Sequence, residues 1–283
     1  MFSAVLLAAG LVFSQADSDL AYRTAKTLVN EHTPRDAGTI RGRLASNCIL
    51  DAASAAGADV RRDVFKAQTP NGEKTFINLY AEFSSGDKNA RWVVLVSHYD
   101  TKPGIKCPGA NDGASTSGLL VGLVNSLTGW KTPKGNLLCV WTDGEECMND
   151  YGPNDGRWGA RRAVDYVESK GMKIQAVVCL DMIGDKDLSI RIPANGSSTL
   201  AKIAVHASRR AGYPGLVSLW DEHVKDDHLP FHEKGYKAIG MIDFDYGPDN
   251  SYWHTEADTM DKISVESLLK SGKVVAEMLN ILL

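Results

Sequence analysis

The stretch Leu137-Leu138-Cys139-Val140-Trp141-Thr142-Asp143-Gly144-Glu145-Glu146 joins a short apolar run to two adjacent carboxylates. An apolar run of this length that ends at polar residues and a glycine is typical of a strand buried inside a sheet. Adjacent side chains of an extended chain point in opposite directions, so one glutamate can bind a metal ion while the other faces the reacting atoms. The stretch therefore predicts a buried strand that is followed directly by a candidate functional loop.

A Glu-Glu pair by itself is usually part of a solvated surface, and other residues of the chain give this pair its significance. His98 and Asp100 follow a second apolar run, and Asp181 ends a third. Asp112 lies in a glycine-rich loop, and His254 lies in the last part of the sequence. Histidine nitrogen and carboxylate oxygen are zinc ligands, and a catalytic zinc keeps one coordination position open. The set has the composition of a zinc site.

The candidate ligands leave the number of metal ions open. They are His98, Asp112, Glu146, Asp181 and His254. Five such ligands can hold two zinc ions that share one carboxylate, whereas three ligands hold one ion. The cysteines have no CxxC spacing, so they indicate neither a thiolate metal site nor a disulfide framework; they are Cys48, Cys107, Cys139, Cys147 and Cys179.

The order of apolar runs and helical patterns predicts the fold class. Helices are expected over residues 18–31, 39–57, 115–126, 159–169, 198–211 and 264–282, with a short one from Leu229, and strands over residues 60–65, 76–83, 92–97, 136–142, 175–181, 188–192 and 238–243. Continuous apolar strands that alternate with helices predict one α/β domain, with a mixed, mostly parallel twisted sheet and helices on both faces. Ligands of such sheets bind beyond the carboxyl ends of the strands, where His98, Glu146 and Asp181 fall.

Length and charge exclude some classes of protein. A chain of 283 residues fits one large domain, and its net charge of −4 gives no electrostatic footprint for nucleic acid. Residues 1–16 contain an apolar run too short to span a membrane but suited to a signal peptide, with small residues at Ser14-Gln15-Ala16. We therefore expect export and a mature domain over residues 17–283. No basic residue precedes the run, so a buried first helix is the alternative.

At several segments the chain resembles the zinc-dependent glutaminyl-peptide cyclotransferases (glutaminyl cyclases), a branch of the peptidase M28 or zinc aminopeptidase superfamily. The segments are Gln68-Thr69-Pro70-Asn71-Gly72, Ser97-His98-Tyr99-Asp100, Gly109-Ala110-Asn111-Asp112, Asp143-Gly144-Glu145-Glu146, Leu180-Asp181-Met182-Ile183-Gly184, Asp226-Asp227-His228-Leu229-Pro230-Phe231 and Trp253-His254-Thr255. The resemblance covers the chain from about residue 40 onward and implies the α/β sandwich of the zinc aminopeptidases.

Three details favour the cyclase branch over the aminopeptidases. The interval from Glu146 to Gly159 is long, as in cyclases. The pair Asp226-Asp227 stands where aminopeptidases commonly have Ser-Asp, and Trp253 precedes His254 where they often have tyrosine. Two positions depart from the animal cyclases: Tyr151 replaces a tryptophan, and Gly240 replaces a histidine.

The resemblance implies that the chain converts the N-terminal glutamine of peptides to pyroglutamate and releases ammonia. It implies one zinc held by Asp112, Glu146 and His254. The fourth coordination position would be open to the γ-amide oxygen of the substrate, and the zinc would polarise this amide. Glu145 would carry the proton from the attacking amine to the leaving nitrogen. The remaining residues would surround this centre: Asp181 and Asp226 hydrogen-bonded around Glu145, and Trp253 and Tyr151 as walls of the substrate pocket. Peptide or protein N-termini are then the partners.

Two other functions are compatible with the residues. A di-zinc aminopeptidase of the same fold would use His98 and Asp181 for a second metal, with Glu145 activating water. An exported binding protein would have kept the fold and lost catalysis. This function is disfavoured because every candidate ligand and Glu145 are present. The sequence does not fix the oligomeric state.

Overall fold

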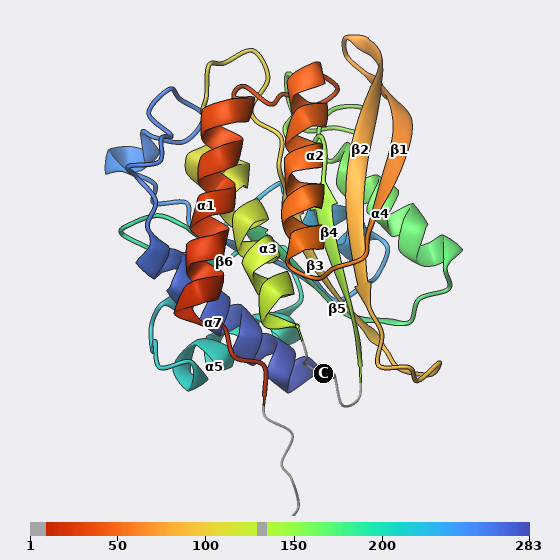
Figure 1. The fold of residues 1–283 in the computed structure, drawn as a ribbon, viewed down its shortest axis with the longest axis vertical. Helices are drawn as coiled ribbons and strands as arrows, with labels where there is room; N and C mark the ends of the chain where they lie inside the picture. Colours follow the sequence, from red (N-terminus) through yellow and green to blue (C-terminus); the bar gives the residue numbers. More distant parts are fainter. Residues whose placement is uncertain (1–9, 129–134) are drawn as a thin grey trace, which may run out of the picture.

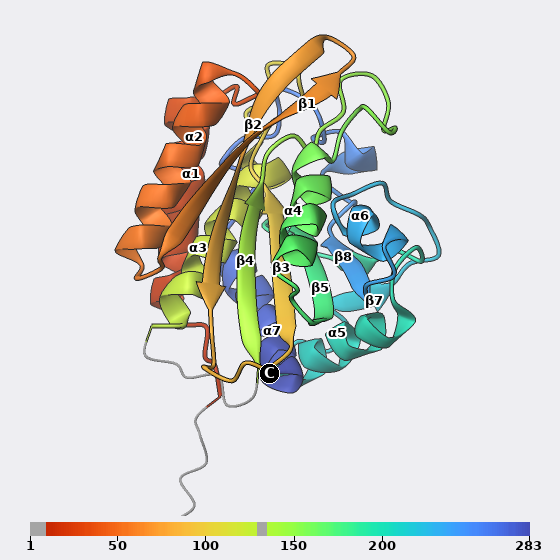
Figure 2. The ribbon, with the colours of Figure 1, turned by 90° about the vertical axis from the view of Figure 1, so that its right-hand side faces the viewer.

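The computed structural model describes residues 10–128 and 135–283 as a mixed eight-stranded sheet between two layers of helices (Figures 1 and 2). The sheet order is β1-β2-β4-β3-β5-β8-β6-β7. The strands are β1 (Val60–Thr69), β2 (Gly72–Phe83), β3 (Trp92–His98), β4 (Asn136–Thr142), β5 (Ile174–Asp181), β6 (Ile190–Ile192), β7 (Val217–Leu219) and β8 (Ala238–Ile242). Strands β4, β3, β5 and β8 run parallel, and β1, β2 and β6 add antiparallel pairings. The predicted fold class is confirmed.

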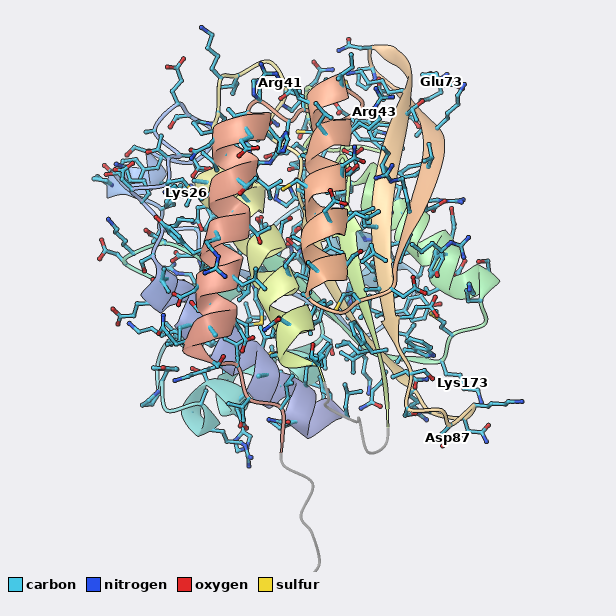
Figure 3. The ribbon with its side chains drawn as sticks, in the orientation of Figure 1. Lys26, Arg41, Arg43, Glu73, Asp87 and Lys173 are labelled. Atoms are coloured by element: carbon cyan, nitrogen blue, oxygen red, sulfur yellow. The ribbon has the colours of Figure 1, made fainter. Side chains whose placement is uncertain are left out.

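Helices cover both faces of the sheet, and the larger layer carries the first and last helices (Figure 2). The helices are α1 (Gln15–His32), α2 (Ile40–Ala55), α3 (Thr116–Ser126), α4 (Trp158–Ser169), α5 (Ser198–Arg210), α6 (His228–Glu233) and α7 (Val265–Leu282), with short helical turns η1 (Ala110–Ser115) and η2 (Pro248–Asn250). Helices α4 and α6 form the smaller layer. Charged side chains such as Lys26 and Glu73 point outward into solvent (Figure 3).

Alternation along the central strands explains why the sheet needs two helical layers. Val93 and Leu95 of β3 pack into the core beneath α1, α3 and α7, while Val94 and Val96 pack against α4 and α6. Successive side chains of a strand point to opposite faces, so a strand that is apolar at every position must be covered on both sides.

The expected elements are present with small differences at their ends, and one strand was missed. Strand β1 runs on to Thr69 because it forms a hairpin with β2, in which Thr69 pairs with Gly72. Strand β7 has three residues and was not predicted. Leu219 of this strand is 61% exposed. Three residues with one buried side chain are too few to form the apolar pattern from which a strand is predicted.

The segment before α1 is packed onto α7. Leu11 and Phe13 are buried, and the side-chain amide of Asn280 bonds both the N–H of Leu11 (2.6 Å) and its carbonyl oxygen (3.0 Å). Ser14 and Asp17 form a capping box that starts α1. Of the predicted signal peptide, residues 1–9 lie outside the described residues. Cleavage next to Ala16 would remove Phe13 and the Ser14 cap from this packing.

Within residues 10–128 and 135–283, no helix is both long enough and apolar enough to cross a bilayer.

Candidate metal centre

Three neighbouring parallel strands bring the predicted residues to one edge of the sheet. His98 is the last residue of β3, Asp181 is the last residue of β5, and Glu145-Glu146 follow the end of β4. These strands are adjacent in the order β4-β3-β5, so their carboxyl ends meet. The site therefore lies where ligands bind in open α/β sheets.

Two loops supply the remaining candidate ligands. Asp112 belongs to η1, the turn between β3 and α3, and departs there from helical backbone angles. His254 lies in the loop between β8 and α7 with φ of +54°, an uncommon conformation for a residue other than glycine. Such backbone positions persist when the surrounding structure fixes them, and they cluster at functional sites.

The candidate ligands form two sets that share Asp112. Nε2 of His254 lies 2.8 Å from Oε1 of Glu146 and 3.2 Å from Oδ2 of Asp112. Nε2 of His98 lies 3.1 Å from Oδ1 of Asp112 and 3.1 Å from Oδ1 of Asp181. In each set the donor atoms lie within 4.8 Å of one another. The geometry has room for one ion at Asp112, Glu146 and His254, or for two ions with Asp112 between them.

The chemistry of these residues fits a divalent cation. Burial raises the pKa of the Asp181 carboxyl to about 7, although His98 works in the opposite direction. Burial by itself would raise the pKa of Asp112. Hydrogen bonds with His254 and His98 outweigh burial and hold this pKa well below the usual range. The buried Oε2 of Glu146 has no hydrogen-bond partner among the described residues, and it forms an ion pair with Nζ of Lys102 at 3.5 Å, a single positive charge beside several carboxylates. Buried carboxylates need a compensating charge, and a cation among these oxygens would provide it.

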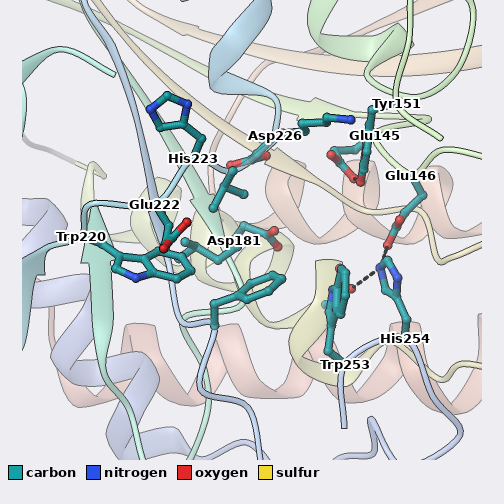
Figure 4. A pocket seen from close by; sticks show the side chains of 15 residues that line it. Glu145, Glu146, Tyr151, Asp181, Trp220, Glu222, His223, Asp226, Trp253 and His254 are labelled. Atoms are coloured by element: carbon teal, nitrogen blue, oxygen red, sulfur yellow. Dashed lines mark hydrogen bonds and ion pairs between the residues drawn. The ribbon is translucent and has the colours of Figure 1, made fainter. Parts of the chain in front are cut away.

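Asp100 holds the two glutamates in place. Its Oδ1 accepts the N–H of Glu145 (3.1 Å), and its Oδ2 accepts the N–H of Glu146 (3.2 Å). Because both backbone groups bond to one buried carboxylate, the turn after β4 is fixed, with Glu146 toward His254 and Glu145 beside Tyr151 (Figure 4). The sequence placed Asp100 beside His98 but gave it no role.

Glu145 has the surroundings of an acid or base. Burial, followed by the negative charge of Glu146, raises its pKa well above the usual range. The hydroxyl of Tyr151 donates a hydrogen bond of 3.0 Å to Oε2 of Glu145. Asp181 and Asp226 line the same cavity, but in the described part of the chain neither bonds Glu145 directly. Asp226 instead accepts from the thiol of Cys179 at 3.3 Å.

A cavity of about 620 Å³ opens beside the candidate ligands (Figure 4). It is lined by the predicted residues Asp112, Glu145, Glu146, Tyr151, Asp181, Asp226, Trp253 and His254, and by Trp220, Glu222, His223, Val224, Lys225, Ile242 and Phe244. His98 is buried and does not line it. One wall is a row of aromatic rings, with centroids 4.8 Å apart from Trp253 to Phe244 and 6.1 Å apart from Phe244 to Trp220.

Trp220 and Phe244 line the pocket but were not predicted from the sequence. Phe244 comes two residues after β8, so the position rule that found His98 and Asp181 would also have pointed to it. Trp220 follows the unpredicted strand β7 and had no such signal.

Gly240 lies directly beside the acidic side of the cavity. A Cβ at this position of β8 would stand 3.1 Å from Oδ2 of Asp226 and 3.1 Å from Nδ1 of His228. The glycine lets these two side chains pack closely against the strand. A larger side chain here would have to displace them.

Comparison with known proteins agrees with this geometry. Residues 78–279 match Peptidase family M28. The chain belongs to peptidase family M28. Among solved structures, this M28 chain is similar to an Acidobacteriales bacterium glutaminyl cyclase, with 31% identity, a TM-score of 0.88, and 100% of this chain and 99% of that chain covered.

Two further comparisons show a sequence similarity to a cyclotransferase-like protein and a fold shared with an aminopeptidase precursor. It is 28% identical to a glutaminyl-peptide cyclotransferase-like protein of Mus musculus over 95% of this chain and 77% of that protein. A leucine aminopeptidase precursor from Bacteroides thetaiotaomicron shares the fold, with a TM-score of 0.84, 22% identity, and 97% and 99% of the two chains covered. The predicted relationship to the glutaminyl cyclases is confirmed, and the fold is common to proteins named for either activity.

Proposed function

We propose that the chain is a zinc-dependent glutaminyl-peptide cyclotransferase. The observation that carries the proposal is the arrangement around Glu146, whose neighbour Glu145 faces the cavity while Glu146 itself lies 2.8 Å from His254. The similarity to glutaminyl cyclases supports the reaction class. The ligands would be Asp112, Glu146 and His254, the nearest set to the open cavity.

The reaction joins the α-amine of an N-terminal glutamine to its own γ-carbonyl carbon and expels ammonia. Zinc, when bound, supplies a Lewis acid that polarises this carbonyl. The amine must lose one proton as the C–N bond forms, and the departing nitrogen must gain one. Glu145 is the carboxylate that can take the first proton and deliver the second, because it faces the cavity and its pKa is raised. Tyr151 orients it through the 3.0 Å hydrogen bond.

The cavity walls define what binds beside the reacting glutamine. Trp253 stacks on the ring of His254 with centroids 4.0 Å apart, which fixes the imidazole and gives the glutamine side chain an apolar wall. Asp181 and Asp226 would bind the α-amine as it enters, since both carboxylates line the same cavity. Peptide N-termini are the substrates that this arrangement would accept.

The second candidate function is a di-zinc aminopeptidase. Its specific support is the second ligand set, in which His98 lies 3.1 Å from both Asp112 and Asp181. The cyclase reaction would need only the first ligand set, Asp112, Glu146 and His254. A binding protein without catalysis has less support, because Glu145 and both ligand sets lie in one site where every member except the half-buried His254 is buried.

We expect the purified protein to release ammonia from peptides with N-terminal glutamine and to leave leucine and alanine anilides intact. The measurement compares ammonia release with aniline release under identical conditions. Anilide turnover that matches or exceeds glutamine cyclisation would replace the cyclase proposal with the aminopeptidase.

The zinc content of the wild type and of His98→Ala provides an independent check. If Asp112, Glu146 and His254 hold a single ion, both proteins should contain one tightly bound zinc per chain, because His98 is not a ligand. Elemental analysis measures this ratio. Two zincs that fall to one in His98→Ala, with anilide hydrolysis lost in parallel, would support the aminopeptidase.

Export remains part of the proposal. Residues 1–16 have the composition of a signal peptide, whereas Leu11 and Phe13 are buried in the described fold. We therefore propose export of the domain with any processing upstream of Leu11.

A further inference from the structure

Two buried residues outside the metal-site motifs hold the backbone of the loop that carries Asp112. Arg35 lies in the linker between α1 and α2, and Asp258 lies four residues after His254. Both side chains are completely buried. Buried charged groups are rare unless they are paired or bonded, so each needs a structural reason.

Asp258 accepts three consecutive backbone N–H groups of this loop. Its carbonyl oxygen accepts from Ala110 (3.2 Å), its Oδ1 accepts from Asn111 (2.8 Å), and its Oδ2 accepts from Asp112 (3.1 Å). The hydroxyl of Tyr246 donates a further bond of 2.6 Å to Oδ1. Hydrogen bonds from N–H groups to a carboxylate are among the stronger hydrogen bonds of proteins, so the loop is held firmly on this side.

Arg35 holds the same loop through its carbonyl groups. Its Nη2 donates to the oxygens of Gly109 (2.6 Å) and Asp112 (3.2 Å), and its Nη1 donates to Pro108 (2.7 Å). Its Nε donates to the oxygen of Tyr99, next to His98 in β3. The guanidinium is rigid and planar, so it fixes several carbonyl groups at once.

The close approach of Arg35 depends on Gly109. A Cβ at this position would lie 2.7 Å from Nη2 of Arg35 and 2.7 Å from the carbonyl oxygen of Asp112. The residue also has φ of +62°, which favours glycine. Backbone conformation and local space therefore both suit the bonds to Arg35.

We propose that Arg35 and Asp258 are positioning residues that fix the peptide of Asp112 from both ends and thereby set the affinity of the metal centre. The N–H of Asp112 bonds to Asp258, and its C=O bonds to Arg35. With both groups held, the Asp112 carboxylate stays between His98 and His254. The proposal rests on Asp112 being a metal ligand in the proposed function.

The test is the zinc affinity of Asp258→Asn in the full chain. The amide keeps the shape but places an N–H₂ group where one carboxylate oxygen accepted a backbone N–H. We expect the zinc Kd, measured by competition with a chromophoric chelator, to rise by about 10–100-fold, as for other residues that support metal ligands. Excess zinc should then restore kcat for glutamine-peptide cyclisation. Because zinc also stabilises the folded state by mass action, the Kd is measured on metal-free protein that circular dichroism shows to be folded at the assay temperature.

Asp243→Asn is the matched control. Asp243 is also a buried carboxylate that accepts two backbone N–H groups, from Ser189 (2.7 Å) and Asp245 (3.1 Å), but it does not touch the Asp112 loop. We expect this variant to have a lower melting temperature than the wild type. Its zinc Kd should stay within about twofold of the wild-type value, below the increase of about 10–100-fold expected for residues that support metal ligands. Equal zinc affinities of Asp258→Asn, Asp243→Asn and the wild type would overturn the proposal.

Two milder variants decide the matter if Asp258→Asn does not fold. Tyr246→Phe removes one hydrogen bond to Asp258 and leaves the N–H groups of Asn111 and Asp112 bonded to its carboxylate. The zinc Kd of this variant should therefore rise by less than about tenfold. Arg35→Lys keeps the positive charge but loses the planar guanidinium. Its zinc Kd should rise by at least as much as that of Tyr246→Phe. Unchanged affinity in both would refute the proposal. A wild type that binds zinc without cyclising glutamine would instead refute only the proposed reaction.

Discussion

Glu145→Gln is expected to keep its zinc and lose turnover. The amide has the shape of the carboxylate and can still contact Tyr151, but it cannot carry a proton from the attacking amine to the leaving nitrogen. General acid–base groups contribute on the order of 10²–10⁴-fold to rate, so kcat for glutamine-peptide cyclisation should fall by about that factor. The zinc content should be unchanged, because Glu146 and not its neighbour lies beside His254.

Glu73→Gln serves as the control for the same chemical change outside the cavity. Glu73 is exposed at the β1–β2 hairpin and pairs with Lys66, so its substitution should leave kcat unchanged. The measurement is ammonia release at saturating substrate, with elemental zinc analysis of each preparation. A Glu145→Gln enzyme that keeps more than about a tenth of the wild-type kcat would remove Glu145 from the role of proton carrier.

His254→Ala and Glu146→Ala are expected to lose metal and activity together. Three protein ligands leave no spare donor, so removal of one takes away a bond that no neighbour replaces. The zinc Kd should rise by more than about 100-fold, beyond the range for residues that only support ligands. Cyclisation should become undetectable at trace zinc concentrations.

His206→Ala provides the matched histidine control. His206 lies exposed on α5, away from the ligand sets, and its removal should change neither zinc content nor rate. The variants are compared by elemental analysis and by the ammonia assay. If His254→Ala or Glu146→Ala retains stoichiometric zinc, the ligand assignment is wrong.

The residues at the ends of the central strands could be predicted from the sequence. His98 and Asp181 end apolar runs, and parallel strands deliver their last residues to one edge of the sheet. The signal is strong because each strand is apolar on both faces and therefore central. The glutamates after β4 were found by the same reasoning.

The number of metal ions and the residues that hold the Asp112 loop could not be predicted in this way. Asp112 lies within 3.2 Å of both His98 and His254, so the same carboxylate suits one ion or two. Arg35 acts through the carbonyl oxygens of other residues, and such bonds leave no residue-type pattern at the partner positions. Trp220 follows a three-residue strand, β7, whose partner among the described strands is β6, 25 residues or more earlier in the chain.

The contact between the first and last helices has a consequence for how the chain acquires its fold during synthesis. The hydroxyl of Ser18 bonds the carbonyl oxygen of Val265 at 2.5 Å, and Leu11 bonds Asn280 across 269 positions of sequence. A growing chain on the ribosome cannot make these contacts until α7 emerges, so the part of α1 that faces α7 stays uncovered until the end of translation, whereas α3 can cover the rest of its buried side earlier. Closure over so long a loop is also slow, because non-local contacts form only after the entropy of the intervening chain has been lost. Nascent chains of this protein should therefore be substrates for chaperones that bind exposed apolar helices, and release from them should coincide with synthesis of α7.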